Sequence, residues 1–545
     1  MQSRTVLAAA IATALAVPVR AQHQFEALHA LPGSGGVSAL GDVDGDGDLD
    51  MIVARAGQNR LLLNDGFGRF VDATAGRLPV DDDVTTSVAL GDVDGDGDLD
   101  IVFGNGAVPG SDHGQQNRLL LNYGAGHFTD ATPSHLPADS DPTAGVVLGD
   151  VDGDGDLDLV CANHKLWLWT DGWSSGPSSY ITTGQQNELY LNDGTGHFTD
   201  ATAVRMPVDS DPTTAVAMGD VDGDGDVDLV FGNGHTDSYW EYEVPGPFGP
   251  LVQSYYETMG TADLVCLNDG TGTFRAMPPL PASWDSSAAV ALGDADGDGD
   301  LDIVVGNVLA SYTYTHNGYP VDGCQNRLYL NDGHGVFSDA TATQLPADGD
   351  VTSALAFADV DVDGDLDLVC ASAAQNRLYL NDGSGDFADV TAVRMPPGDS
   401  ASVSVALGDV DADGDLDLVV GRYLQVRLYT NLLQQLDATQ PPQVGQPYSL
   451  DAFARCGTQA VFDVAVVFLS TTRVSIPIPP FGLLGIEPTA ILPTVVIPQP
   501  AGVGSIAWTV PNVPNAVGTA IYSQALIVSW PFGARFTNVV AGVVQ

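Results

Sequence analysis

One short acidic motif occurs seven times along the chain, and this repetition limits the folds that the chain can adopt. The motif has the form D-x-D-x-D-G-D-x-D, and a similar set of flanking residues surrounds each occurrence. The second unit shows the pattern well, with "SVALGDVDGDGDLDIVFGN" followed by "QNRLLLNYGAGHFTDAT". The motifs begin at Asp42, Asp92, Asp150, Asp220, Asp294, Asp359 and Asp409.

Each unit is predicted to contain four short strands. In the second unit these are residues 88–90, 100–103, 118–121 and 127–131, and most units have an Asn-Asp-Gly turn between the third and fourth strands, as at Asn64-Asp65-Gly66. Asn-Asp-Gly is a signal for a tight hairpin. Four antiparallel strands per unit are typical of a propeller blade, and the units lack the 3.6-residue periodicity of helical repeats. The sequence therefore predicts an all-β, seven-bladed β-propeller.

The ends of this region predict how the ring closes. The seventh unit lacks its fourth strand, and residues 24–27, followed by Leu31-Pro32, resemble the missing segment. An N-terminal strand that completes the last blade would leave no exposed sheet edge. The alternative is that these residues form an unpaired leader.

The motifs are candidate metal sites, because each places carboxylates at positions 1, 3, 5, 7 and 9 of a tight loop. Calcium prefers six to eight oxygen ligands in flexible geometry, whereas magnesium retains water ligands. Position 12 is apolar in every motif, as at Val53, which excludes an EF-hand. We expect seven calcium ions, one per blade. The candidate ligands are Asp42, Asp44, Asp46, Asp48 and Asp50; Asp92, Asp94, Asp96, Asp98 and Asp100; Asp150, Asp152, Asp154, Asp156 and Asp158; Asp220, Asp222, Asp224, Asp226 and Asp228; Asp294, Asp296, Asp298, Asp300 and Asp302; Asp359, Asp361, Asp363, Asp365 and Asp367; and Asp409, Asp411, Asp413, Asp415 and Asp417.

With these loops, the sequence resembles the FG-GAP or VCBS repeat proteins, which include the propellers of integrin α-subunits. The resemblance covers residues 22–431. It implies that the loop joins the first two strands of a blade, and that calcium is held by the side chains at positions 1, 3, 5 and 9 and by the carbonyl of position 7. Val362 and Ala412 depart from the pattern, because they replace glycine at position 4. We interpret the ions as structural.

The candidate ligand-binding residues are aromatic. They lie in insertions between the second and third strands of blades three to five, on the face expected to be opposite the acidic loops. Exposed aromatic side chains on a rigid scaffold favour recognition of sugars or proteins. The alternative is that these long loops bury their aromatics in small cores of their own. The candidates are Trp167, Trp169, Trp173, Tyr239, Trp240, Tyr242, Tyr312 and Tyr314.

The charge of the chain excludes one class of partner and supports the metal sites. The formal net charge is −53, and seven motifs of five aspartates hold 35 of the 71 acidic residues. With only 18 Lys and Arg and no basic cluster, nucleic acid is excluded as a partner. Cys161 and Cys370 occupy the same position in two repeats and are predicted to be buried core residues, whereas the state of the other cysteines is left open.

The two ends of the chain predict export and a second domain. Residues 1–21 are typical of a signal peptide cleaved near Ala21, and no later stretch is predicted to span a membrane. Residues 432–545 lose the aspartate motifs and are predicted to form a small β-sandwich. Because no catalytic motif is found, we expect a secreted or cell-surface binding or adhesion module for a glycan or an extracellular protein. The alternatives are a calcium-dependent polysaccharide lyase or hydrolase and a purely structural surface protein.

Overall fold

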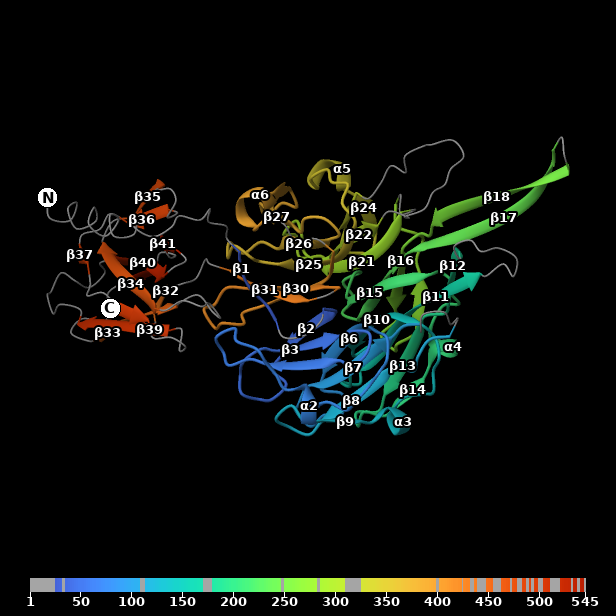
Figure 1. Cartoon of the computed structure of the whole chain (residues 1–545), viewed down its shortest axis with the longest axis horizontal. Helices are drawn as coiled ribbons and strands as arrows, with labels where there is room; N and C mark the ends of the chain where they lie inside the picture. The colour runs from blue at the N-terminus through green and yellow to red at the C-terminus, as the bar shows by residue number, and fades with distance from the viewer. Residues whose placement is uncertain are drawn as a thin grey trace.

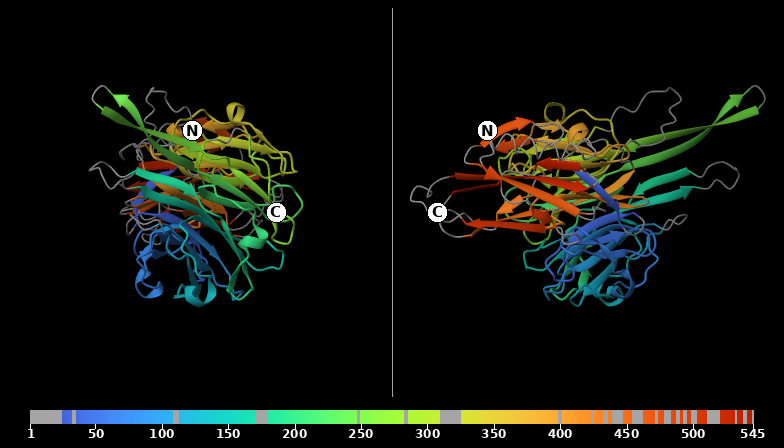
Figure 2. Two further views of the ribbon diagram at one scale, coloured as in Figure 1. Left: turned by 90° about the vertical axis from the view of Figure 1, so that its right-hand side faces the viewer. Right: turned by 60° about the vertical axis from the view of Figure 1, so that its left-hand side comes forward.

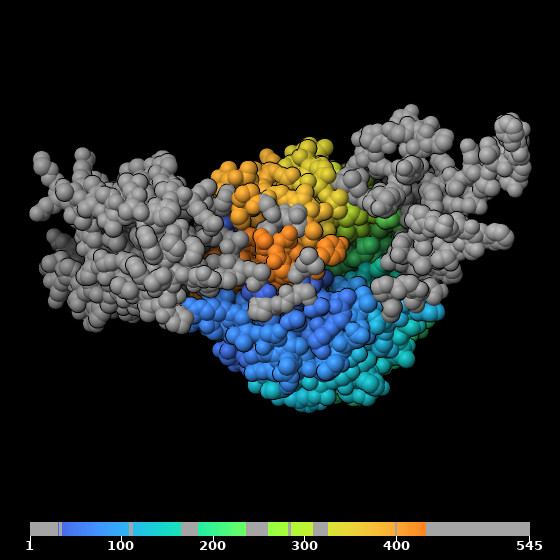
Figure 3. Space-filling view, in the orientation of Figure 1, coloured from blue at the N-terminus to red at the C-terminus, as the bar shows by residue number. Residues whose placement is uncertain are grey.

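The computed structural model describes residues 25–431, apart from 32–34, 108–112, 170–178, 247–248, 282–284, 309–324, 398–400 and 424, and the backbone of strands between 436 and 543. Residues 25–431 form seven antiparallel sheets arranged as the blades of a β-propeller (Figure 1); each has four blade strands, and the sheet of blade three has a fifth strand, β12 (Ser179–Gly184). This confirms the predicted all-β propeller. In the space-filling view the first three blades, blue to cyan, pack against one another without a break (Figure 3).

The second blade shows why these residues form strands. It contains β6 (Thr85–Gly91), β7 (Asp100–Asn105), β8 (Arg118–Asn122) and β9 (Phe128–Asp130), paired in chain order. All six residues of β7 are buried, which suits the apolar run of a strand covered on both faces. The one-turn helix α3 (Thr132–His135) follows β9. The four predicted strands are therefore confirmed, with ends that differ by a few residues.

The other blades repeat this order. Blade one contains β2 (Val37–Gly41), β3 (Asp50–Ala54), β4 (Arg60–Leu63) and β5 (Val71–Asp72). Blade three contains β10 (Thr143–Gly149), β11 (Asp158–Trp169), β13 (Glu188–Asn192) and β14 (Phe198–Asp200). Blade four contains β15 (Thr213–Gly219), β16 (Asp228–Asn233), β19 (Leu264–Asn268) and β20 (Phe274–Ala276). Blade five contains β21 (Ser286–Gly293), β22 (Asp302–Val308), β23 (Arg327–Asn331) and β24 (Phe337–Asp339).

Blade six contains β25 (Thr352–Ala358), β26 (Asp367–Ser372), β27 (Arg377–Asn381) and β28 (Phe387–Asp389). Blade seven contains β29 (Ser402–Gly408), β30 (Asp417–Arg422) and β31 (Val426–Thr430). One-turn helices follow the fourth strands of three further blades: α4 (Thr202–Arg205), α5 (Thr341–Gln344) and α6 (Thr391–Arg394). In blade one the equivalent segment, α2 (Thr74–Arg77), is distorted, with non-helical backbone angles at Ala75 and Gly76.

An N-terminal strand closes the ring. β1 (Glu26–Ala30) pairs antiparallel with β31 and is the fourth strand of blade seven, with Glu26 opposite Thr430. The first strand of blade one, β2, contacts both β6 of blade two and β29 of blade seven. The predicted closure is confirmed, although the strand begins at residue 26 rather than 24.

The hydrophobic core lies between neighbouring blades. In one cluster Val102 and Leu119 of blade two pack with Leu159 and Cys161 of blade three, and the clusters of the other blades are built in the same way. Cys161 and Cys370 are fully buried, as predicted. They and the buried Cys266 are free thiols, whereas Cys324 and Cys456 lie outside the described residues.

Two insertions continue as hairpins away from the ring. β11 extends beyond its blade and pairs with β12 (Ser179–Gly184). In blade four, β17 (His235–Gly246) and β18 (Gly249–Gly260) form a two-stranded sheet of their own, which projects from the ring in both views of Figure 2. β12 and β17 contact each other, so the two hairpins lie side by side.

After blade seven the described backbone consists of further strands. They form a three-stranded sheet, a six-stranded sheet around the pair β34–β40, and the pair β35–β36. The sandwich stays a prediction, because the side chains that would pack between the sheets lie outside the described part of the structure. The strands are β32 (Leu436–Ala438), β33 (Pro447–Phe453), β34 (Phe462–Ser470), β35 (Arg473–Pro477), β36 (Leu483–Ile486), β37 (Ala490–Ile491), β38 (Val495–Ile497), β39 (Val503–Thr509), β40 (Ala520–Trp530), β41 (Gly533–Phe536) and β42 (Val540–Val543).

Within the described part of the chain, no helix has the length and apolar character needed to cross a membrane.

Candidate metal sites and the opposite face

Each acidic motif forms the turn between the first two strands of its blade, and its first aspartate organises that turn. The Asp42 carboxylate accepts hydrogen bonds from the backbone N–H groups of Gly45 (2.8 Å) and Gly47 (2.9 Å). Gly47 has a φ of 97°, a conformation that glycine adopts without strain. The N–H of the glycine at position 6 donates to the first aspartate in the other six loops as well, so each loop wraps around this carboxylate.

The ninth aspartate ties the loop to the blade. Asp50 lies at the start of β3, where its carboxylate accepts hydrogen bonds from the N–H of Val43 (3.2 Å) and from the N–H of Asn64 at the end of β4 (2.9 Å). The same two bonds recur in all seven blades, the last between Asp417 and the N–H groups of Val410 and Asn431. Position 9 is therefore a fixed, buried carboxylate in every blade.

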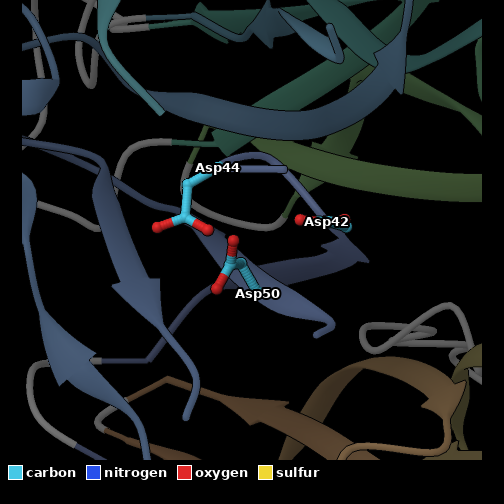
Figure 4. A group of neighbouring side chains, drawn as sticks. All are labelled: Asp42, Asp44 and Asp50. Carbon is cyan, nitrogen blue, oxygen red and sulfur yellow. The ribbon is translucent and has the colours of Figure 1, made fainter. Parts of the chain in front are cut away.

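The third aspartate carries a buried oxygen that lacks a hydrogen-bond partner. This is Oδ1 in five loops, at Asp44, Asp152, Asp222, Asp296 and Asp361. A buried carboxylate oxygen without a donor is costly unless another positive group satisfies it. In the first loop, one carboxylate oxygen each from Asp42, Asp44 and Asp50 lie within 4.8 Å of one another, and Figure 4 shows the carboxylates of Asp44 and Asp50 turned toward each other.

Burial raises the pKa of the ninth aspartate in every blade. The pKa of Asp50 is raised to about 6 and that of Asp100 to about 7, mainly by desolvation and further by the aspartates at positions 3 and 5. Asp158, Asp228 and Asp302 are raised to about 6 and Asp367 to about 7, and the pKa of Asp417 is raised well above the usual carboxyl value. A cation among these groups would stabilise their charged form. The loops therefore fit a hard divalent cation such as calcium, which prefers carboxylate oxygens.

The structure brings the predicted ligands together unequally. Positions 1, 3 and 9 converge in the first, third and fourth loops, whereas positions 1, 3 and 5 converge in the second. The side chain at position 7 lies against the hairpin turn of its own blade: a Cβ on Gly66 would come within 2.6 Å of the Asp48 carboxylate oxygens. Val362 and Ala412, which replace glycine at position 4, keep positive φ angles of 60° and 57°. They preserve the turn at the cost of local strain.

The seventh loop differs in burial. Asp411, Asp413 and Asp415 have only 3%, 3% and 1% of their surface exposed, although position 5 is exposed in the other six loops. Burial and the neighbouring aspartates raise the pKa of Asp413 to about 12. The carboxylates at positions 3, 5 and 7 of this loop are therefore buried, unlike the exposed position 5 of the other six loops.

The sequence reasoning missed an asparagine that links neighbouring blades. The Asn122 side-chain N–H donates to the carbonyl of Val43 in the preceding blade (2.8 Å), and the Asn64 side chain closes the circle by donating to the Val410 carbonyl (2.8 Å). The sequence signal for this link was the asparagine that recurs at the end of the third strand in all seven units. The other members are Asn192, Asn268, Asn331, Asn381 and Asn431.

The opposite face carries an acidic cluster that the sequence reasoning also missed. One oxygen each from Asp139, Asp141 and Glu188 lie within 4.8 Å of one another at the seam between blades two and three. Burial, followed by the charge of Asp139, raises the pKa of Glu188 to about 7. In five of the other blades an arginine occupies the Glu188 position: Arg60, Arg118, Arg327, Arg377 and Arg427.

The predicted aromatic residues are placed only in part. Trp167 and Trp169 belong to β11, and Tyr239, Trp240 and Tyr242 belong to β17. The strand register places Trp167 opposite Ile181, Tyr239 opposite Tyr256 and Trp240 opposite Tyr255. Trp173, Tyr312 and Tyr314 lie outside the described residues.

The fold and the loops together define a class: a seven-bladed β-propeller in which each blade carries an aspartate-rich loop that can hold a metal ion. The model of the FG-GAP-like repeat matches residues 42–103, 107–161, 179–231, 251–305, 320–370 and 359–420. The chain belongs to this family, as the sequence predicted.

Comparison with individual proteins adds little beyond the family. No curated protein matches the chain. Among solved structures, one from a study of specific recognition of non-reducing terminal N-acetylglucosamine by an Agrocybe aegerita lectin is 17% identical, with a TM-score of 0.37, covering 66% of this chain and 79% of that one. The Photorhabdus luminescens Tc holotoxin pore is 14% identical (TM-score 0.31; 87% of this chain, 22% of that one). A fructofuranosidase from Schwanniomyces occidentalis complexed with fructose is 8% identical (TM-score 0.27; 97% and 94%). Likenesses this low carry no argument about function.

Proposed function

We propose that the protein is an exported, calcium-stabilised binding module whose two hairpins on the face opposite the loops hold a glycan. One observation carries the proposal: the register of the β17–β18 hairpin places Tyr239 opposite Tyr256 and Trp240 opposite Tyr255. Aromatic residue types at facing positions of a projecting hairpin favour recognition of sugars, because sugar rings bind to flat apolar ring surfaces.

Acidic residues share this hairpin with the aromatics. Alternate residues of a strand lie on one face, so Asp237 and Glu241 share a face with Tyr239 and its partner Tyr256. Carboxylates accept hydrogen bonds from sugar hydroxyl groups. Aromatic and acidic residue types that alternate with this register therefore favour neutral, hydroxyl-rich ligands over anionic ones.

The loops have a different role in this proposal. Calcium holds the ring rigid, and the N-terminal segment 1–21 directs export to a compartment where calcium is plentiful. The C-terminal strands form a sandwich that serves as an attachment module. A metal ion that binds only the folded state stabilises that state.

The test is a glycan array probed with the full chain in calcium. Y239A/Y256A and W240A/Y255A should lose binding, whereas Tyr123→Ala should retain it, because Tyr123 is a 66% exposed aromatic in a turn on the loop face. Binding that survives both double variants would contradict the proposal. If the same variants lose binding to a protein but no glycan binds, the ligand is a protein. Release of products from a polysaccharide would replace the proposal with a lyase or hydrolase.

A further inference from the structure

Three of the acidic loops have an arginine as a built-in cation. The Arg77 guanidinium at the end of α2 lies 3.3 Å from Oδ2 of Asp44, the third residue of the loop in the same blade. Arg205 of α4 lies 3.4 Å from Oδ2 of Asp152. Arg394 of α6 lies 3.2 Å from Oδ2 of Asp361. Blades one, three and six therefore share this contact.

The arginine also joins neighbouring blades. Arg77 donates to the carbonyl of Ala125 in the Gly-rich turn of blade two (2.6 Å), and Arg205 donates to the carbonyl of Thr271 in blade four. In blade five the equivalent residue is Gln344, whose side-chain N–H donates to the Ser384 carbonyl of blade six (3.1 Å). Glutamine thus keeps the bond between blades without the positive charge.

The remaining loops provide the contrast. The equivalent residue of blade two is His135, whose ring stacks on His197 of blade three, with ring centroids 3.9 Å apart. In blade four, β20 is followed by Met277-Pro278, and the described residues there include no helical turn. Asp222 of blade four and Asp296 of blade five keep the same unpartnered Oδ1 as the arginine-bearing loops. The three arginine-bearing loops therefore differ from the loops of blades four and five in charge, not in the position of this oxygen.

The charge acts directly on a bound divalent cation. A guanidinium on one oxygen of a carboxylate lies within a few ångströms of a cation on the other oxygen, where like charges repel strongly in a partly buried site. Calcium affinity in oxygen-ligand loops varies over orders of magnitude with the charge of the ligand set. The arginine cancels one of the negative charges that attract the ion.

We propose that Arg77, Arg205 and Arg394 divide the calcium loops into two classes. The loops of blades one, three and six bind calcium more weakly than those of blades two, four and five, and their arginines serve as counter-ions that hold these loops together when calcium is scarce. The inference rests on the proposed occupancy of the loops by calcium and goes beyond it, because it ranks the loops. Blade seven, whose loop carboxylates are buried, is outside the ranking.

The test is a calcium titration of the full chain, in which isothermal calorimetry and native mass spectrometry monitor binding. The wild type should fill in two phases. R77Q/R205Q/R394Q copies the arrangement of Gln344 and should tighten the weak phase about tenfold, since each site loses one repelling charge. R77K/R205K/R394K should keep the weak phase, because lysine retains the charge.

A charge-matched control uses arginines whose partners lie outside the loops. Arg60 pairs with Asp72, Arg327 with Asp339 and Arg377 with Asp389. R60Q/R327Q/R377Q removes the same total charge and should leave both phases unchanged. If this control tightens calcium binding as much as the loop variant does, net charge rather than the contact is responsible, and the inference is wrong.

A readout without calcium tests the counter-ion role. In chelator, R77Q/R205Q/R394Q should melt at a lower temperature than the wild type, whereas in saturating calcium the two should melt together. If the triple variant fails to fold, the three single variants are titrated, and each should tighten a single site. A single class of sites that the loop variants leave unchanged would overturn the inference alone. Absence of any calcium binding would instead overturn the calcium assignment.

Discussion

The two faces of the ring differ in how closely the blades resemble one another. On the loop face, the same hydrogen bonds recur in each blade: the ninth aspartate accepts from two N–H groups, and an asparagine reaches into the preceding blade. On the opposite face, neighbouring blades differ in length and in charge, as the β17–β18 hairpin and Glu188 show. Residues that have the same structural role in every blade recur from blade to blade, whereas residues on a face that serves recognition can differ between blades.

The seams between blades show this contrast within a few residues. At the seam of blades one and two, Arg118 pairs with Asp83 and lies 3.1 Å from Asp130, so one guanidinium is shared by two carboxylates. At the seam of blades two and three, Glu188 replaces this arginine beside Asp139 and Asp141. On the loop side of the same seam the asparagine is present as in the other blades: the Asn192 side-chain N–H donates to the carbonyl of Val93 (2.8 Å).

Removal of calcium should produce the largest effect, because it acts on all seven loops together. Metal that binds only the folded state stabilises it through mass action, by several kcal/mol for tight sites. We expect a chelator to lower the melting temperature by about 10 °C or more, and added calcium to restore it, whereas magnesium should restore it only in part. Differential scanning calorimetry measures this shift. A melting curve that does not respond to chelator would show that the carboxylates do not need an ion.

A single seam asparagine should have the next largest effect. In blade four, the Asn268 side-chain N–H donates to the carbonyls of Val151 (2.7 Å) and Val227 (3.0 Å), and its oxygen accepts from the N–H of Gly272 (3.1 Å). Asn268→Ala leaves these buried groups without partners and should cost about 2 to 4 kcal/mol of unfolding free energy, measured by urea denaturation. Thr271→Ala in the same turn removes only an exposed hydroxyl and should cost less than about 0.5 kcal/mol. Equal losses in the two variants would mean that the asparagine does not hold the seam.

A substitution in the acidic cluster on the opposite face should have a smaller effect, and should raise rather than lower the unfolding free energy. Glu188→Arg places the residue found at this position in blade two beside Asp139 and Asp141, and should raise the unfolding free energy at pH 8 by about 1 kcal/mol. Thermal melts of the calcium-loaded protein measure the change. A variant that is destabilised at this pH would show that the seam does not tolerate the guanidinium.

The same cluster predicts a pH dependence of the wild type. The pKa of Glu188 is raised to about 7 and that of Asp139 to about 6, both mainly by burial, and both groups also face Asp141, while Asp139 faces Asp200 and Glu188 faces Tyr190. Because these folded-state pKa values lie above the usual carboxyl values, the stability they contribute is complete below about pH 4 and is lost as the pH rises through 6 to 7. Glu188→Gln should flatten this loss between pH 5 and 8, with calcium kept saturating throughout.

The sequence predicted most of the propeller but less of the opposite face, for a physical reason. Seven copies of one motif reveal both the strands and the loop ligands, because each copy reports the same local geometry. The asparagine seam escaped notice because its partner lies in another blade, as with Asn64 and Val410, which are 346 residues apart. The acidic cluster escaped for the same reason: Glu188 and Asp139 are distant in the chain and meet only when the blades close.

Deletion of the β17–β18 hairpin should have the smallest effect on stability and the largest on binding. His235 and Gly260 face each other at its base, so residues 236–259 can be replaced by a short Gly-Ser turn. The hairpin forms a sheet of its own rather than part of blade four, and the main contacts of β17 and β18 with other described strands are with β12 and with β21 of blade five. We therefore expect the melting temperature in calcium to stay within about 2 °C of the wild type while glycan binding is lost. A large drop in melting temperature would instead make the hairpin part of the fold, and the division between a structural loop face and a variable binding face would then not hold.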